Sequence, residues 1–598
     1  MKYCEQIYQT QRRKTREVLV GNVGVGGDNP IRIQSMTTSD TRDVEATVGQ
    51  IIRLADAGCE IARVTVQGKK EAEACEGIKN GLLQKGYTIP LVADIHFYPP
   101  AAMLVAEYAD KVRINPGNFV DKRASFQTII YDDASYAEEL ERLEEKFAPL
   151  VEKCKRLKKA LRIGVNHGSL SDRVMNRYGD SPRGMVESAV EFTRVCRKLD
   201  FHDIIFSMKA SNTQVMIEAY RLITADMISL GWDYPLHLGV TEAGEGEDGR
   251  VKSAIGIGSL LLDGLGDTIR VSLTEDPWLE IDPCKRLVQF AHSYVGKGIA
   301  PFVETGRQLG AFERRTVETK APLHRDGSVI VVVSASEIEA PSFFTDLGCK
   351  MQLGRPSKEP GTVDAVLASI EHPKLDKLRE AGIGVITTPY AVTEDPIQWE
   401  AILFDHPEVI FFAPSQHFLH NSRKFFDWLK MQSLKIPVIL NFTYPETAEN
   451  VVIQAAAELG SLLCDGMGEG VCIQANISLA PRASLGFAVL QGARMRSSKT
   501  EFISCPGCGR TLFDLQTVAA KIRLRTAHLP GVKIAIMGCI VNGPGEMADA
   551  HFGYVGSLPG RIDLYVGKTR VEKNIPMDEA DDRLVELIKK HGRWIETA

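Results

Sequence analysis

The sequence predicts an α/β protein whose N-terminal part is a TIM barrel, that is, a (β/α)8 barrel. Eight short runs with the apolar character of strands occur in the first 300 residues. Stretches of helical periodicity, such as residues 43–58 and 184–199, lie between most of them. A strand followed by a helix, repeated eight times, is typical of this fold.

The eight expected strands begin near Ile31, Ile61, Leu91, Val112, Leu161, Ile204, Leu236 and Thr268. The connection after the fourth strand is longer than the others. It holds a charged segment, residues 137–159, which we expect to form an extra, solvated helix.

Two further α/β units follow, and we expect domains at residues 1–298 (the barrel), 299–495 (the insert) and 496–598 (the C-terminal domain). Residues 258–266 read GSLLLDGLG and residues 460–468 read GSLLCDGMG, an offset of 202. Similarity at one fixed offset indicates an internal repeat. We therefore interpret the insert as a second, degenerate TIM-like domain with a structural role.

The composition is that of an ordinary globular protein, with 44% hydrophobic and 25% charged residues. The net charge of −6 argues against a general nucleic-acid binder, which needs a basic surface. No apolar run approaches the roughly 20 residues that cross a bilayer, and the N-terminus has no secretory signal. We expect a cytoplasmic protein, with most of its cysteines acting as small buried apolar residues.

Four residues near the C-terminus have the grouping of metal ligands. Cys505 and Cys508 form a Cys-Pro-Gly-Cys turn, Cys539 follows a predicted strand, and Glu546 comes after two glycines and a proline. A [4Fe–4S] cluster usually takes four cysteines. A carboxylate in the fourth place would be more labile, because iron–sulfur sites favour sulfur, and a substrate oxygen could replace it.

The spacing of these residues alone leaves two alternatives open. One is structural zinc held by the three cysteines with His551, although zinc sites usually pair two close cysteines with a second close pair. The other is a redox-active dithiol at Cys505 and Cys508, which leaves Cys539 unexplained.

Polar residues crowd the carboxyl ends of the predicted barrel strands, where TIM barrels carry their active sites. They are Gln34, Arg63, Asp94, His96, Arg113, Asn115, Arg162, Asn166, His167, Lys209, Ser211, His237, Glu242, Arg270 and Ser272. Four arginines and a lysine among them indicate a phosphate or diphosphate ligand, since arginine binds such oxygens in a bidentate manner. At the 202 offset Arg270 becomes Cys472 and Glu242 becomes Tyr444, so the insert has lost this polar mouth.

Several sequence strings together resemble one family. They are IQSMT, VADIHF, RINPGN, GVNHGSL, LHLGVTEAGEGEDGRVKSAIGIG, GDTIRVSL, CPGC and GCIVNGPGE. These are similar to the 4-hydroxy-3-methylbut-2-enyl diphosphate synthases, the iron–sulfur oxidoreductases of the non-mevalonate isoprenoid pathway. The match covers about 1–298 and 496–598, and the insert resembles that of the long, three-domain form.

The resemblance implies the reductive ring opening of 2-C-methyl-D-erythritol 2,4-cyclodiphosphate to 4-hydroxy-3-methylbut-2-enyl diphosphate, with loss of water. It implies a [4Fe–4S] cluster on Cys505, Cys508, Cys539 and Glu546. It implies a diphosphate site made of Arg63, Arg113, Arg162, Lys209, Arg270 and Ser272. It places Asp94, Asn166 and Glu242 near the carbon skeleton and Asn542 near the cluster; we expect Glu242, Glu546 and Asn542 to act in catalysis.

The electron donor that the resemblance implies is ferredoxin or flavodoxin. We expect the protein to be either a monomer or a homodimer. The insert could let a chain cover its own barrel with its own C-terminal domain. Two other functions remain open from the residues. One is a barrel enzyme for another phosphorylated or pterin-like ligand with a structural zinc. The other is an electron-transfer or scaffold protein.

Overall fold

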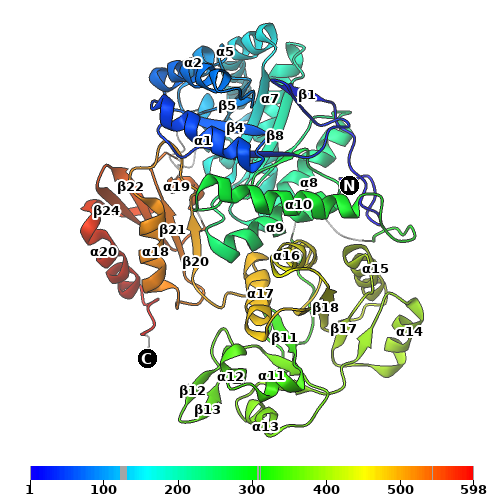
Figure 1. Cartoon of the computed structure of the whole chain (residues 1–598). Coiled ribbons are helices and arrows are strands. Elements are labelled where there is room, and N and C mark those ends of the chain that lie inside the picture. Colours follow the sequence, from blue (N-terminus) through cyan, green and yellow to red (C-terminus); the bar gives the residue numbers. More distant parts are fainter. Residues whose placement is uncertain are drawn as a thin grey trace.

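A computed structural model of the chain describes residues 2–121, 131–305, 309, 312–541, 543–547 and 549–596. The barrel and the insert lie at opposite ends of the molecule, and the C-terminal domain lies beside them (Figure 1). In the part of the chain that the structure describes, no helix is long and apolar enough to cross a membrane.

The barrel contains the eight parallel strands expected from the sequence. They are β3 (Arg32–Met36), β4 (Ile61–Val66), β5 (Leu91–Ile95), β6 (Lys111–Ile114), β7 (Ala160–Asn166), β8 (Ile204–Lys209), β9 (His237–Leu238) and β10 (Thr268–Ile269). The strand order is β8-β7-β6-β5-β4-β3-β10-β9, and a parallel bridge from Phe206 to Leu236 brings the two edges together. The predicted (β/α)8 barrel is confirmed.

Ten helices of the described residues surround or cover these strands. They are α1 (Val44–Ala57), α2 (Lys69–Gln84), α3 (Pro99–Val105), α4 (Pro116–Phe119), α5 (Asp133–Leu157), α6 (Asp172–Tyr178), α7 (Pro182–Lys198), α8 (Thr213–Ser229), α9 (Gly246–Leu262) and α10 (Ile281–Tyr294). The expectation of an extra solvated helix was wrong in one respect. α5 is the connection between β6 and β7 itself, and it buries an apolar face that includes Leu143, Phe147 and Val151.

A hairpin that the sequence analysis missed covers the amino end of the barrel. Its strands are β1 (Val18–Val20) and β2 (Val23–Val25). Their valines form a buried cluster with residues at the starts of barrel strands, including Ile61, Ala160 and Ile205. The hairpin therefore closes the end of the barrel opposite the active-site mouth.

The insert holds a seven-stranded parallel sheet with the strand order of an incomplete barrel. Its strands are β11 (Ser328–Val332), β14 (Ala365–Leu367), β15 (Gly384–Ile386), β16 (Ala391–Val392), β17 (Ile410–Phe412), β18 (Val438–Tyr444) and β19 (Gly470–Ala475). The order is β15-β14-β11-β19-β18-β17-β16, with no pairing between β15 and β16 among the described residues. Apolar side chains from five strands, including Phe411, Ile439 and Cys472, fill its interior.

The remaining elements of the insert are short strands and covering helices. They are β12 (Lys350–Gln352), β13 (Arg355–Ser357), α11 (Ala335–Glu339), α12 (Phe343–Asp346), α13 (Pro373–Glu380), α14 (Pro396–Asp405), α15 (Phe418–Met431), α16 (Ala448–Cys464) and α17 (Leu479–Gly492).

The sequence repeat is also a repeat of structure, because α16 matches α9 residue for residue at the 202 offset. The two helices pack against each other between the barrel and the insert (Figure 1). A Cβ at Gly258 would lie 2.5 Å from the Cβ of Ala457, and a Cβ at Gly460 would lie 2.4 Å from Cγ1 of Ile255. Since Ala457 is the counterpart of Ile255, and Gly460 of Gly258, the contact is reciprocal, as in a two-fold dimer.

A buried ion cluster repeats the same symmetry. Arg221 and Arg423 are counterparts at the 202 offset, as are Asp263 and Asp465. Each arginine contacts both aspartates; Arg423 lies 2.8 Å from Asp263 and 3.2 Å from Asp465. The barrel and the insert are thus joined as two related halves within one chain.

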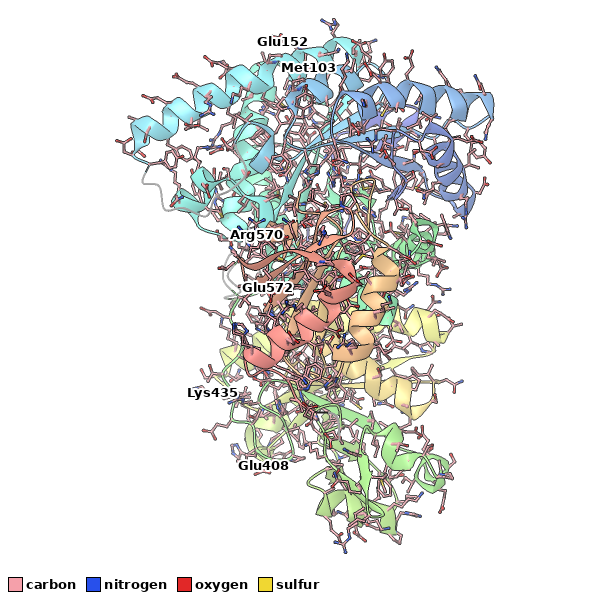
Figure 2. All side chains as sticks on the ribbon, turned by 90° about the vertical axis from the view of Figure 1, so that its left-hand side faces the viewer. Met103, Glu152, Glu408, Lys435, Arg570 and Glu572 are labelled. Carbon is pink, nitrogen blue, oxygen red and sulfur yellow. The ribbon has the colours of Figure 1, made fainter. Side chains whose placement is uncertain are left out.

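The C-terminal domain is a five-stranded sheet with two long helices packed on one face. Its elements are β20 (Glu501–Ser504), β21 (Lys533–Met537), β22 (Phe552–Leu558), β23 (Arg561–Val566), β24 (Thr569–Pro576), α18 (Leu515–Thr526), α19 (Gly543–Glu546) and α20 (Met577–Lys590). β20, β21 and β22 are parallel, and β23 and β24 are antiparallel to their neighbours. In Figure 2 this domain faces the viewer, with Arg570 and Glu572 of β24, between the barrel above (Glu152) and the insert below (Glu408).

Candidate active site

One cavity lies between the barrel mouth and the C-terminal domain of the same chain. The barrel lines it with Met36, Arg63, Asp94, His96, Arg113, Arg162, Asn166, Lys209, Thr241, Glu242, Arg270 and Ser272. The C-terminal domain lines it with Cys505, Pro506, Gly507, Cys508, Arg510, Thr511, Met537, Gly538, Cys539, Gly543 and Glu546. The strand ends of the barrel and the cysteines of the distant C-terminal domain therefore share one cavity.

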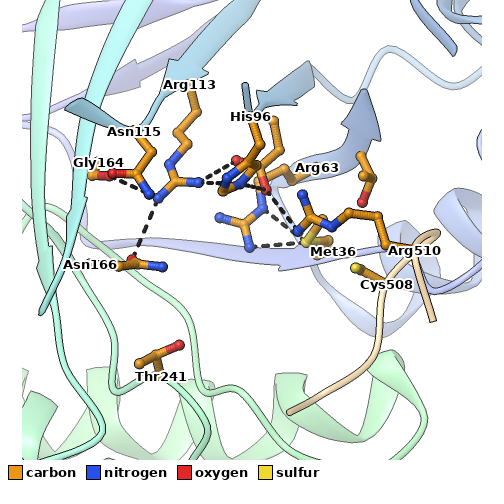
Figure 3. A network of polar contacts seen from close by, with 12 residues as sticks. Met36, Arg63, His96, Arg113, Asn115, Gly164, Asn166, Thr241, Cys508 and Arg510 are labelled. Atoms are coloured by element: carbon orange, nitrogen blue, oxygen red, sulfur yellow. Dashed lines mark hydrogen bonds and ion pairs between the residues drawn. The ribbon is translucent and has the colours of Figure 1, made fainter. Parts of the chain in front are cut away.

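A tight network orders one side of the mouth (Figure 3). Arg113 donates to Asp94 at 2.8 Å and to the carbonyl of Gly164 at 2.8 Å, and its Nη1 lies 2.7 Å from Nε2 of His96. Burial raises the pKa of Asp94, but the charges of Arg113 and Arg63 outweigh it and hold that pKa well below its usual range. Burial lowers the pKa of His96 to about 3, with help from the positive charge of Arg510. The network thus presents a neutral imidazole and an ionised aspartate.

Arg270 is held on the opposite side by a paired carboxylate. Glu280 accepts two hydrogen bonds from Arg270, both at 3.0 Å, and further bonds from Ser35 at 2.7 Å and from the backbone of Leu273 at 3.1 Å. The fork geometry fixes the guanidinium before any ligand binds.

Other cations of the mouth lack such partners. None of the three guanidinium nitrogens of Arg162 has a hydrogen-bond partner among the described residues, although the side chain is fully buried. Burial and the neighbouring Arg63 lower the pKa of Arg162 and of Lys209. Burial, chiefly, lowers the pKa of Arg63 to about 10. The ionised Asp94 offsets part of this positive charge, but it is already paired with Arg113. The excess of desolvated cations destabilises the empty protein and indicates that an anion belongs here.

Two carboxylates meet at the boundary between the barrel and the C-terminal domain. Asn166 donates to Oε1 of Glu546 at 2.6 Å, and Thr241 donates to Glu242 at 3.2 Å. Glu242 has a φ of 53°, a strained backbone conformation that is most often found at functional sites. Burial, followed by the adjacent charge of Glu546, raises the pKa of Glu242 well above its usual value. This arrangement therefore favours the protonated form of Glu242.

The three C-terminal cysteines are partly exposed, whereas the other cysteines of the chain are buried. The backbone N–H of Gly538 donates to the sulfur of Cys505 at 3.3 Å, the kind of hydrogen bond that tunes iron–sulfur centres. Gly507, between Cys505 and Cys508, has a φ of +79°, which allows the tight turn. The donor set and its N–H···S bond fit an iron–sulfur cluster.

The zinc interpretation fits less well. Among the residues that the structure describes, no three His, Cys, Asp or Glu side chains converge as a single metal ion requires. His551 accepts from the backbone of Lys533, at the start of β21, while Cys539 follows the end of that strand. The five residues of this strand alone span roughly 13 Å, so His551 and Cys539 lie at opposite ends of it.

Two glycines bring the backbones of the barrel and the C-terminal domain close together. A Cβ at Gly168 would lie 2.1 Å from the carbonyl oxygen of Gly545, and a Cβ at Gly545 would lie 1.8 Å from that of Gly168. Ion pairs flank this contact, with Lys568 3.1 Å from Asp180 and Lys252 2.9 Å from Glu501. The bare backbone contact lets Glu546 reach Asn166.

Most of the mouth residues named from the sequence line this cavity, and five do not. Gln34, Asn115, His167, Ser211 and His237 are absent from its lining. His167 and Ser211 line a small neighbouring pocket instead. Asn542 falls outside the described residues.

Arg510 and Thr511 line the cavity but were not expected from the sequence, and neither was the nearby cation Lys111. Lys111 is fully buried on β6 and lies 3.4 Å from Gln34, and its two-residue spacing from Arg113 was a usable signal. The position of Arg510, two residues after Cys508, gave a weaker signal.

Comparison with known proteins identifies the family. Residues 15–285 match the GcpE TIM-barrel domain, and residues 501–590 match the GcpE protein C-terminal domain. The 4-hydroxy-3-methylbut-2-en-1-yl diphosphate synthase (flavodoxin) of Protochlamydia amoebophila is 58% identical over 100% of this chain and 98% of its own length. The chain belongs to this family.

Long relatives extend the similarity through the insert. The chloroplastic synthases (ferredoxin) of Oryza sativa and Arabidopsis thaliana are 51% and 50% identical over 100% of this chain and 89% of their own length. Among solved structures, 7,8-dihydropteroate synthase from Vibrio fischeri is 11% identical over 46% of this chain and 97% of its own, with a TM-score of 0.31. A likeness this distant carries no structural argument.

Proposed function

We propose that the protein catalyses the reductive ring opening of 2-C-methyl-D-erythritol 2,4-cyclodiphosphate to 4-hydroxy-3-methylbut-2-enyl diphosphate. One observation carries the proposal. Buried cations without an ion-pair partner among the described residues share one cavity with three cysteines and two glutamates. The first group suits a diphosphate, and the second suits delivery of electrons and a proton.

The barrel cations hold the diphosphate. Arg162, Lys209 and Arg63 supply positive charge from buried side chains, so each contact with an anion is stronger than it would be in water. Arg270 and Arg113, already fixed by Glu280 and by Asp94, supply donors in set directions, and Ser272 supplies a hydroxyl. Asp94 and Asn166 face the carbon skeleton and its hydroxyl groups.

A carboxyl group of the site supplies the proton. The reaction takes up two electrons and one proton and releases water, and the proton joins the departing hydroxyl group. Glu242 is the group that holds a proton here, because burial and Glu546 raise its pKa. We assign Glu242 as the general acid, with Asn166 keeping Glu546 beside it.

Cys505, Cys508 and Cys539 would hold a [4Fe–4S] cluster, with Glu546 as its removable fourth ligand and Asn542 nearby. When bound, the cluster supplies the two electrons one at a time. A ferredoxin or a flavodoxin would be their source, as the names of the relatives indicate.

An anaerobic assay tests this proposal. Purified protein should contain iron and acid-labile sulfide and should convert the cyclic diphosphate when dithionite is the reductant. Zinc without sulfide, or no turnover by protein with a full cluster, would contradict it. A pterin-like ligand that binds instead of the cyclic diphosphate would favour the alternative barrel enzyme.

A further inference from the structure

Arg510 is a cation that the C-terminal domain places in the barrel mouth. Its side chain is 7% exposed and lines the cavity, and its Nη2 lies 3.9 Å from Oδ2 of Asp94 in the barrel. Its Nε and Nη1 are buried and have no hydrogen-bond partner among the described residues. Arginine keeps its positive charge in proteins, so this buried side chain is a cation.

The neighbour of Arg510 across the cavity is a second arginine. Figure 3 shows Arg510 entering beside Cys508 and ending next to Arg63 and Met36. Arg63 has contacts to the sulfur of Met36 at 2.9 and 3.1 Å, which supply no negative charge. Burial is the main cause of the lowered pKa of Arg63; Asp94 opposes it, and the charges of Arg270, Arg113 and Arg510 add to it. Asp94 lies near both guanidinium groups but is already paired with Arg113 at 2.8 Å, so one negative charge faces three arginines. A further anion between Arg510 and Arg63 relieves the repulsion that remains between these desolvated groups.

We propose that Arg510 is a substrate-contacting residue that binds an anionic oxygen of the cyclic diphosphate together with Arg63. This inference rests on the proposed function. Arg510 belongs to the C-terminal domain and Arg63 to the barrel, so an oxygen bound to both holds the cavity closed. Without the anion, the repulsion between the two arginines opposes closure. Substrate binding and closure are therefore coupled, because the ligand binds the closed arrangement more tightly than the open one.

Calorimetric titration of cluster-loaded protein with the cyclic diphosphate tests the contact. Arg510→Met should weaken binding about 10- to 100-fold, the range expected for a charge-assisted hydrogen bond. Arg510→Lys keeps the charge and should recover part of the loss. Arg523→Met is the matched control, since Arg523 pairs with Glu245 at 2.7 Å across the same boundary but does not line the cavity. Its affinity should stay close to that of the natural protein.

Small-angle scattering with and without the cyclic diphosphate tests the coupling. The natural protein and Arg523→Met should become more compact with ligand, and Arg510→Met should change less. Unchanged affinity and unchanged compaction in Arg510→Met would overturn the inference. If that variant loses its iron and sulfide, Arg510→Gln is measured in its place under the same criteria. Failure of the natural protein to bind would instead contradict the proposed function.

Discussion

At the scale of single residues, the active-site mouth contains arginines in two different electrostatic situations. Arg270 is neutralised by Glu280 in a buried pair, whereas Arg162 has no partner among the described residues. Both line the same cavity, so both are expected to serve the ligand. Their effects on the stability of the protein should differ in sign.

Replacing Arg162 by methionine should stabilise the ligand-free protein by roughly 1–3 kcal/mol, because a desolvated charge is removed. Replacing Arg270 by methionine should destabilise it by about 3 kcal/mol, because Glu280 is left buried and unpaired. Both variants should bind the cyclic diphosphate at least about 10-fold more weakly. Thermal unfolding and ligand titration measure both variants, and each variant is the control for the other. Equal shifts in Tm would contradict the predicted difference in sign.

At the scale of elements, strand ends could be placed from the sequence better than contacts between domains. Arg63, Arg113 and Arg162 follow the strand pattern, and the barrel geometry brings them together. The β1–β2 hairpin was missed although Gly21 and Asn22 supply a two-residue turn signal between valine-rich runs. The contact of Gly168 with Gly545 depends on how the C-terminal domain packs, and no local pattern encodes that distance.

Gly168→Ala should hinder closure, because the new methyl group would overlap the backbone of Gly545. A displacement of about 1 Å in the closed site should lower kcat about 100-fold while each domain stays folded. Gly49→Ala in α1 is the control, since a Cβ there meets nothing within 4 Å. Steady-state kinetics and circular dichroism of both variants check the prediction, and normal turnover by Gly168→Ala would show that the glycine contact is dispensable.

The helix pair between the barrel and the insert carries a pH-sensitive group. Glu458 on α16 accepts a hydrogen bond from Tyr294 of α10, and burial raises its pKa to about 7. Because its pKa is higher in the folded protein than in the unfolded chain, the protonated carboxyl group favours the folded state. That contribution to the free energy of unfolding is lost as pH rises from about 4.5 to 7. Glu458→Gln should therefore gain stability relative to the natural protein by on the order of 3 kcal/mol between pH 5 and pH 8. Urea unfolding at both pH values measures this, and a pH-independent difference would rule it out.

At the scale of the whole molecule, one chain contains what resembles a two-fold dimer. The 202-residue repeat could be read from the sequence because glycine-rich turn residues were retained. The closeness of α9 and α16 and the shared ion cluster could not be read, because both depend on how the two halves pack. The C-terminal domain of this chain covers the barrel of the same chain.

A mixing experiment tests whether capping occurs within one chain in solution. Arg270→Ala removes a barrel cation, and Cys539→Ser removes a cluster ligand. A mixture of the two should show no more activity than its components, because each intact barrel is capped by its own damaged domain. Mixtures of each variant with natural protein control for inhibition, and recovered activity would mean that capping occurs between chains.

The β1–β2 hairpin at the amino end of the barrel bears on the rate of turnover. The valines of the hairpin close that end of the barrel, and the C-terminal domain covers the other end. We therefore expect ligand exchange to require movement of the C-terminal domain away from the barrel mouth. Each opening of the domain allows one substrate to bind and one product to leave, so kcat cannot exceed the rate of domain opening. Electron transfer does not require this opening and can take place while the domain covers the barrel. Solvent viscosity should therefore slow the exchange of ligands without slowing the supply of electrons.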